Sequence, residues 1–149
     1  MRGYLLDTNV VSELRKGERA NAGVTEWHRQ RDKRELFLSV ITIAELRRGI
    51  ALIRRRDEPQ AAALDRWCTV IERGFSRVGH LLTIRPAEAN AWGELSAIRP
   101  LQIMDAFLAA TALTHNLTLV TRNEAHFSHL TITVENPFRD DPHAAETSK

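Results

Sequence analysis

Short apolar runs alternate along this chain with segments of helical periodicity. Each run is apolar throughout, which is typical of a strand buried on both faces of a sheet. The segments between the runs hold hydrophobic residues at spacings of three and four, which predicts helices. Strands alternating with helices predict an α/β fold, in which helices cover both faces of a central parallel sheet. The expected strands are residues 3–6, 36–40, 80–84, 117–121 and 131–134.

Two helical segments have distinctive patterns. Residues 103–115 are apolar almost all round, as expected of a helix that is buried on several sides. An earlier helix is expected to end at Glu58-Pro59, and the segment after it places its hydrophobic residues on one stripe. That stripe is either core or a surface for a partner, and it consists of Leu64, Trp67, Cys68, Ile71 and Phe75.

Length and composition limit the class of protein. With 149 residues, 43% of them hydrophobic, the chain suits one domain with one core. We expect this domain over residues 1–138 and a flexible C-terminal tail over residues 139–149, which lack an apolar pattern. No apolar run approaches the roughly 18 residues of a membrane span. Because Cys68 is the single cysteine, no intrachain disulfide can form, and a cytoplasmic protein is expected.

The charge of the chain says little about a partner. Its 21 basic and 19 acidic residues leave a formal net charge of +2, which is weak evidence for a polyanionic ligand. The arginines at 54–56 point in several directions on a helix and are expected to be solvated. Arg122, which follows a predicted strand, is the better candidate for a phosphate contact.

Four polar residues from distant parts of the chain fall where one site could form. Asp7 and Asn123 follow predicted strands, whereas Glu45 and Asp105 are expected in the first turns of helices. Ligands of open parallel sheets bind beyond the carboxyl ends of the strands, so the fold could bring these four side chains to one edge.

Each acid also has a local structural explanation. Asp7 could be a helix cap or a turn residue. Glu45 could belong to a capping box that begins at Thr42. Asp105 could complement the positive end of its helix. This last explanation is the weakest, because the neighbours of Asp105 are apolar and an unpaired buried carboxylate is costly.

A functional explanation joins the three acids. Converging carboxylates repel one another, and a divalent cation would relieve that repulsion. Oxygen ligands without paired cysteine or histidine favour Mg²⁺ or Mn²⁺ over Zn²⁺. Such ions activate a water and stabilise the leaving oxygen in phosphodiester cleavage, so the acids predict a nuclease.

Four motifs occur in an order and at separations that resemble PIN-domain ribonucleases, specifically the VapC-type toxins of type II toxin–antitoxin systems. The motifs are LLDTNVVSEL, SVITIAELRRGI, IMDAFLAATA and LTLVTRN, and the resemblance covers residues 3–138. It implies a Rossmann-like α/β/α sandwich, a Mg²⁺ or Mn²⁺ site, and endonucleolytic cleavage of RNA. It also implies a homodimer and a cognate antitoxin, whose C-terminal segment would fill a clamp that includes the hydrophobic stripe.

The resemblance also assigns roles to single residues. Asp7, Glu45 and Asp105 match the catalytic acids of the family, with Asp7 and Asp105 as metal ligands. Asn123 departs from the pattern, because many members carry a fourth acid there, and this puts a second metal ion in doubt. Supporting residues of the pocket would be Thr8, Asn9, Thr121 and Asn123, and residues in contact with the substrate would be Arg122 and His126.

Other functions stay open at this point. A catalytically inert PIN-like module that binds protein or RNA is supported by the neutral Asn123 alone. A phosphatase with an aspartyl nucleophile is disfavoured, because Asn9 occupies the place where such enzymes commonly have a second acid. A dinucleotide-binding enzyme is less favoured still, since none of the seven glycines builds a G-x-G-x-x-G turn.

Overall fold

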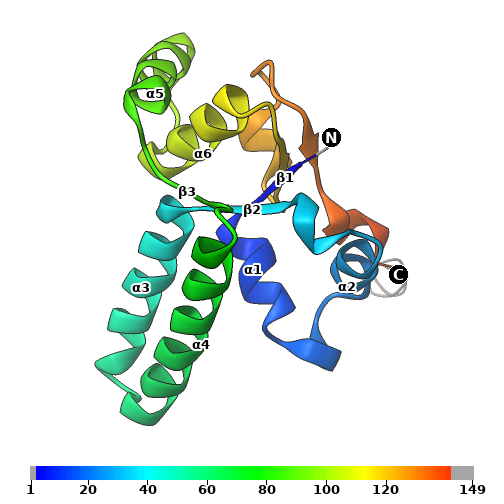
Figure 1. The fold of residues 1–149 in the computed structure, drawn as a ribbon, viewed down its shortest axis with the longest axis vertical. Helices are drawn as coiled ribbons and strands as arrows, with labels where there is room; N and C mark the ends of the chain where they lie inside the picture. The colour runs from blue at the N-terminus through cyan, green and yellow to red at the C-terminus, as the bar shows by residue number, and fades with distance from the viewer. Residues whose placement is uncertain (1–2, 142–149) are drawn as a thin grey trace.

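The computed structural model describes residues 3–141, and in this part of the chain five parallel strands form one sheet. The strand order is β3-β2-β1-β4-β5, so β2 and then β3 lie on one side of β1, and β4 and then β5 lie on its other side (Figure 1). The strands are β1 (Tyr4–Leu6), β2 (Leu36–Ser39), β3 (Leu81–Leu82), β4 (Thr118–Val120) and β5 (Val134–Glu135). The predicted α/β fold with a parallel sheet is therefore confirmed.

Helices cover the two faces of this sheet (Figure 1). Side chains alternate along β1, so Tyr4 and Leu6 join the core beneath α1 to α4, whereas Leu5 joins the core beneath α5 and α6. The α/β/α sandwich implied by the family resemblance is thus confirmed. The helices are α1 (Thr8–Leu14), α2 (Ala22–Arg29), α3 (Val40–Arg54), α4 (Glu58–Arg77), α5 (Pro86–Ile98) and α6 (Ile103–Thr114).

Three elements have boundaries that differ from the expectation. Pro59 lies in the first turn of α4 rather than at the end of α3, because a proline at that position gives up no helical hydrogen bond. The strand expected over residues 131–134 is instead β5 at Val134–Glu135, and the strand expected over residues 80–84 pairs only at Leu81–Leu82. Both are edge strands, where pairing on a single side leaves the ends of the strand unfixed.

The C-terminal segment packs against α2. Short 3-10 helices include η3 (Glu124–Phe127) and η4 (Pro137–Asp140). A Cβ atom at Gly23 would clash with the carbonyl oxygen of Pro137, so α2 and η4 approach closely. Asn21 also donates to Asp141 Oδ2 at 2.9 Å. The packed structure therefore reaches at least three residues beyond the expected boundary at 138, and residues 142–149 of the expected tail lie outside the described residues.

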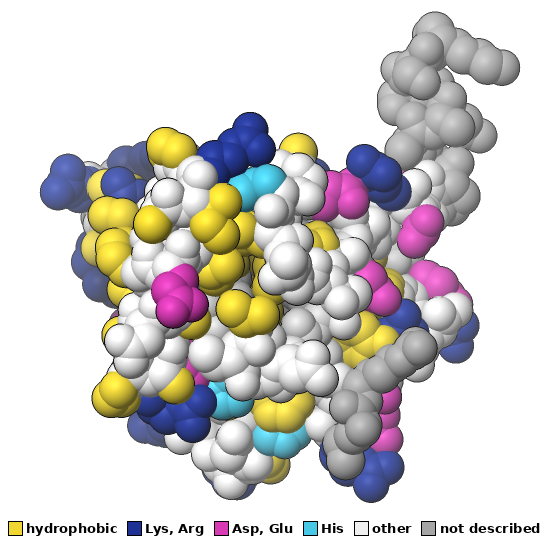
Figure 2. All heavy atoms as spheres, turned by 90° about the horizontal axis from the view of Figure 1, so that it is seen from above, with side chains coloured by type: hydrophobic (Ala, Val, Ile, Leu, Met, Phe, Trp, Pro, Cys, Tyr) yellow, Lys and Arg dark blue, Asp and Glu magenta, His cyan; other side chains and the backbone are white. Residues whose placement is uncertain are grey.

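Apolar side chains are exposed at the end of the molecule formed by α5 and α6. Figure 2 looks onto this end and shows hydrophobic side chains gathered there. Exposed hydrophobic residues of these two helices are Ile98, Ile103, Met104 and Leu113. Homodimerisation, which such a surface would suit, stays a prediction. Among residues 3–141, no helix has the length and apolar character needed to cross a membrane.

Candidate acidic site

Asp7 directly follows the last residue of β1 and lies beside the end of β4. Its backbone N–H donates to Val120 O at 2.9 Å, and its side chain is buried. Three groups donate to its carboxylate: the Thr8 N–H to Oδ1 at 2.6 Å, and the Thr121 hydroxyl and the Asn9 amide to Oδ2 at 2.7 and 3.2 Å. Asp7 is also the N-cap of α1, so the capping explanation and the site explanation both apply to it.

Thr8 and Asn9 each connect Asp7 to another segment. The Thr8 hydroxyl donates to Glu45 Oε1 at 2.9 Å, which links the start of α1 to α3. The Asn9 Oδ1 accepts the Arg122 N–H at 3.1 Å, which links α1 to the loop after β4. The polar sequence Asp-Thr-Asn after an apolar strand therefore joins three segments at one edge of the sheet.

Glu45 has no part in capping, so the expected capping box is wrong. Helix α3 begins at Val40, and its N-cap is Ser39, whose hydroxyl accepts the Ile41 N–H at 3.0 Å. Thr42 is thus already helical, and its buried hydroxyl lies 3.4 Å from Leu6 O. Glu45 consequently lies in the second turn rather than the first. Ser39, directly before the helical pattern, was the capping signal that the sequence reading missed.

The three acids interact electrostatically without a compensating cation. Burial raises the pKa of Asp7, hydrogen bonds from Thr121, Thr8 and Asn9 lower it, and the charge of Asp105 raises it. The pKa of Glu45 is raised by its partial burial and by the charges of Asp7 and Asp105, against a lowering by Thr8. Within residues 3–141, no lysine or arginine forms an ion pair with any of these acids.

Asp105 lies in the first turn of α6, as expected, but it is less enclosed than its apolar neighbours suggested. Its side chain is 17% exposed, and its neighbour Met104 is 40% exposed. His126, from η3, contacts it with Nδ1 3.2 Å from Asp105 Oδ2. The structure therefore places the sequence-predicted residue His126 beside the third acid.

Arg122 and Asn123 follow β4 at the same edge of the sheet. The Thr121 hydroxyl accepts the Asn123 N–H at 3.0 Å, so Thr121 connects Asp7 to this loop. The Arg122 guanidinium lies over the Phe138 ring, 4.5 Å from the centroid. An RNA contact by Arg122 would compete with this cation–π contact and stays a prediction.

The donor set suits a hard divalent cation held by few protein ligands. Mg²⁺ commonly takes one or two carboxylates and keeps several waters. Among the described residues, no group of three or more acid, histidine or cysteine side chains is positioned to bind one ion. Two carboxylates, those of Asp7 and Asp105, would hold such an ion, which stays a prediction.

Comparison with known proteins assigns the chain to a family. The model of the PIN domain matches residues 4–132, most of the chain. The chain belongs to the PIN-domain family. This PIN domain is also 35% identical over 141 residues to the plasmid stability protein StbB of Pseudomonas syringae pv. tomato, with 90% of this chain and 97% of StbB covered.

Two further relatives and a solved structure cover almost the whole PIN domain. The toxin FitB of Neisseria gonorrhoeae is 30% identical, with 91% of this chain and 99% of FitB covered. The VapC ribonuclease Y4jK of Sinorhizobium fredii is 30% identical, with 90% and 96% covered. The structure of FitAB bound to an IR36 DNA fragment superposes with a TM-score of 0.73 at 27% identity, covering 91% of this chain and 95% of that chain.

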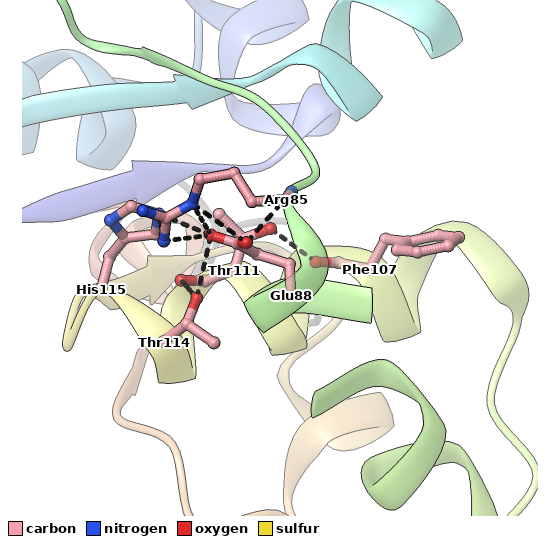
Figure 3. A network of polar contacts seen from close by, with 6 residues as sticks. All are labelled: Arg85, Glu88, Phe107, Thr111, Thr114 and His115. Atoms are coloured by element: carbon pink, nitrogen blue, oxygen red, sulfur yellow. Dashed lines mark hydrogen bonds and ion pairs between the residues drawn. The ribbon is translucent and has the colours of Figure 1, made fainter. Parts of the chain in front are cut away.

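A second charged cluster of the PIN domain fixes α6 against α5 (Figure 3). Glu88, fully buried near the start of α5, receives hydrogen bonds from the Arg85 guanidinium, the closest at 2.7 Å. His115 Nε2 lies 2.8 Å from Glu88 Oε1, and the Thr114 hydroxyl lies 3.3 Å from it. The Arg85 hydrogen bonds chiefly hold the pKa of Glu88 at about 2. This cluster anchors the end of the helix that carries Asp105 in its first turn.

Proposed function

We propose that this PIN-domain protein is a Mg²⁺- or Mn²⁺-dependent endoribonuclease toxin that a cognate antitoxin inhibits. The observation that carries the proposal is the gathering of Asp7, Glu45 and Asp105 at one edge of the sheet, where their charges interact and no lysine or arginine of residues 3–141 pairs with them. A relative named as a VapC ribonuclease and one named as the toxin FitB support the same activity class.

The residues have distinct roles in this proposal. Asp7 and Asp105 would hold the cation, which when bound lowers the pKa of a water and stabilises the charge on the leaving oxygen. Thr121, Thr8 and Asn9 fix both oxygens of Asp7, so the carboxylate keeps one orientation. Such support by neighbouring groups is usual around ligating carboxylates.

Glu45 is the residue best suited to accept a proton from the attacking water. Its raised pKa brings it closer to the working pH, which favours a general base. The Thr8 hydroxyl occupies only Oε1, so Oε2 has no protein donor among the described residues. The proton would therefore pass to Oε2 while the water oxygen bonds to phosphorus. The P–O bond to the leaving ribose oxygen would break, and that oxygen would take up a proton from solvent.

Cleavage of a structured RNA pool by the purified, antitoxin-free protein tests this function. We expect site-specific cuts with Mg²⁺ or Mn²⁺ that are lost with EDTA and in Asp7→Asn. Asp140→Asn is the matched control, because Asp140 is exposed in η4 and forms no ion pair within residues 3–141. Cuts that persist in Asp7→Asn, or that survive EDTA, would contradict the metal-dependent mechanism.

An inert binding module is the second candidate, because Asn123 is neutral where many family members carry an acid. A Mn²⁺ titration beside the cleavage assay separates the nuclease from this inert module. The active pocket should bind Mn²⁺ more weakly in Asp7→Asn than in the wild type. Mn²⁺ binding without any RNA cleavage would favour the inert module.

The hydrophobic stripe of α4 contributes both to the core and to an apolar groove. Cys68 is fully buried, whereas Ile71 and Phe75 line two adjoining pockets of about 430 and 190 Å³. We place the C-terminal segment of the antitoxin in this groove, because an amphipathic segment in an apolar groove is a common recognition mode. Two basic side chains at the groove favour a segment with acids beside its apolar residues: Arg15 and Lys33.

Val70 offers a test of this placement, since it lines the groove and is 69% exposed. Val70→Glu should weaken copurification of the cognate antitoxin without reducing RNA cleavage. Leu52→Glu, an equally polar change at an exposed apolar residue of α3, is the control. Undiminished antitoxin binding by Val70→Glu would contradict the placement of the antitoxin segment in this groove.

A further inference from the structure

An open pocket of about 260 Å³ adjoins the acidic site and shares Asp105 with it, but the function described above gives the pocket itself no ligand. We propose that it binds the base of one unpaired RNA nucleotide next to the bond that is cut, an inference that rests on the proposed ribonuclease function. We name it the histidine pocket, and the lining residues that carry the argument are Arg99, Gln102, Asp105, His126 and His129.

The position of the histidine pocket suits a nucleotide that flanks the scissile phosphate. Asp105 belongs both to this pocket and to the acidic site, where its charge acts on Asp7 and Glu45. His126 lines the pocket and contacts the same carboxylate. A chain that passes its phosphate over the three acids would therefore place an adjacent nucleotide at the mouth of the pocket.

The size and chemistry of the lining match one base. The volume lies just below the roughly 300 to 1,000 Å³ of pockets for drug-sized ligands, so a single base fits better than a larger group. Arg99 is exposed and forms no ion pair among the described residues. Its planar guanidinium can stack on a base or bind a phosphate. Recognition of unpaired RNA commonly combines such stacking with hydrogen bonds to the base edge.

His129 supplies the observation that points to a missing partner. Both of its ring nitrogens are buried, and neither has a hydrogen-bond partner within the described structure. Buried polar atoms without partners are rare because they cost free energy. A neutral imidazole carries one donor and one acceptor, as the edge of a base does. A turn of the ring toward a base in the pocket would give one of these nitrogens a hydrogen-bond partner on the base edge.

A metal ion is not a suitable occupant of the histidine pocket. His126, His129 and Asp105 are the residue types that bind zinc, but they do not form a metal-binding group in the described chain. The pocket also contains the amide of Gln102, whose side chain makes no capping hydrogen bond at the start of α6. An amide, two imidazoles and a guanidinium together favour a ligand with several donors and acceptors.

Sequence preference at the cut site is the first test. The purified protein would cleave RNAs randomised at the positions that flank the cut, and the products would be sequenced. We expect His129→Phe to reduce the preference at one flanking position about tenfold, the effect of losing a single hydrogen bond. The thermal midpoint of His129→Phe should equal or exceed that of the wild type, because the change removes two unpaired buried nitrogens. An unchanged preference would overturn the proposal.

Arg99→Ala, with Arg55→Ala as its control, extends this test to the second side of the pocket. Arg55 is an exposed arginine at the end of α3. We expect Arg99→Ala to slow cleavage about tenfold with little change in the thermal midpoint, and Arg55→Ala to cleave as the wild type does. Equal cleavage rates for the two variants would show that Arg99 does not contact the nucleotide.

Nucleotide binding without cleavage separates failure of the histidine pocket from failure of the proposed function. In EDTA, the four nucleoside 5′-monophosphates and ribose 5-phosphate would each be titrated into the wild-type protein while histidine ring signals are followed by NMR. His129→Phe assigns the His129 signal. A shift with at least one nucleotide and none with ribose 5-phosphate supports a base site, even if no RNA is cut. No shift with any nucleotide, or an equal shift with ribose 5-phosphate, would overturn it.

Discussion

Thr121→Val should destabilise the protein by an amount that depends on the charge of Asp7. Thr121 is fully buried, and its hydroxyl donates to Asp7 Oδ2 at 2.7 Å while accepting the Asn123 N–H at 3.0 Å. Valine keeps the shape of the side chain and removes only the hydroxyl. The variant therefore isolates the contribution of this hydroxyl to the acidic site.

The magnitude follows from the two protonation states of Asp7. A hydrogen bond to a charged group contributes about 1.5–3 kcal/mol, whereas one between neutral groups contributes about 0.5–1.5 kcal/mol. With Asp7 ionised, we expect a loss of about 2 kcal/mol in the free energy of unfolding. This corresponds to a fall of about 4–8 °C in the midpoint for a protein of this size. Once Asp7 is protonated, the loss should shrink to about 1 kcal/mol.

The sign of the pH dependence follows from the raised pKa of Asp7. Because burial lifts this pKa above 3.8, the ionised carboxylate destabilises the folded state, and stability from this group rises as pH falls through its folded pKa. Thr121 lowers the pKa of Asp7, so its removal raises that pKa further. The stability of Thr121→Val should therefore approach that of the wild type as the pH falls from 8 through the folded pKa of Asp7.

Urea denaturation in EDTA, between pH 8 and the lowest pH at which the wild type folds, measures this difference without linkage to metal binding. Thr111→Val is the matched control, because Thr111 is equally buried and donates to Phe107 O at 2.8 Å inside α6. Its loss should be about 1 kcal/mol at every pH. A loss in Thr121→Val that is as independent of pH as in Thr111→Val would refute the reasoning.

Two other predictions concern stability. Glu88→Gln should lower the free energy of unfolding by about 2–3 kcal/mol at neutral pH, because it weakens the Arg85 pair. Since the pKa of Glu88 is about 2, this loss should be constant above about pH 4.5 and should disappear as the pH falls toward 2. Gly23→Ala should lower the free energy of unfolding by at least about 2 kcal/mol, because its Cβ atom would clash with Pro137. Gly49→Ala, in open space inside α3, should raise the free energy of unfolding by about 0.5–1 kcal/mol, and thermal unfolding measures both. Equal midpoints for the two alanine variants would contradict the close packing of α2 on η4.

Several features of this protein were readable from its sequence. The apolar runs predicted parallel strands, and the positions of Asp7 and Asp105 relative to those runs placed both acids at one edge of the sheet. The spacing of the residues that share a face is a local property, because alternate residues of a strand and every third or fourth residue of a helix face the same side. The motif order likewise carried the family resemblance, which the match to the PIN domain confirmed.

Local capping signals were less reliable than the hydrophobic pattern. Thr42 and Glu45 satisfy the spacing of a capping box, yet the N-cap of α3 is Ser39, three residues before Thr42. Parallel pairing of β2 with β1 and β3 fixes where that strand ends, and the helix starts at that point. The tertiary context therefore overrode a valid local alternative and freed Glu45 for the acidic site.

The partners of the acids were decided by the tertiary structure alone. Thr121 reaches Asp7 across 114 positions of sequence because β4 pairs with β1, and Thr8 reaches Glu45 across 37 positions because α3 packs beside α1. The exposure of Asp105 and the unpaired nitrogens of His129 likewise depend on how α6 and the η3 segment pack. The sequence determined which residues lie at the edge of the sheet, since that follows from local pattern. Which of them touch one another follows from strand pairing and helix packing, and no local pattern encodes these contacts.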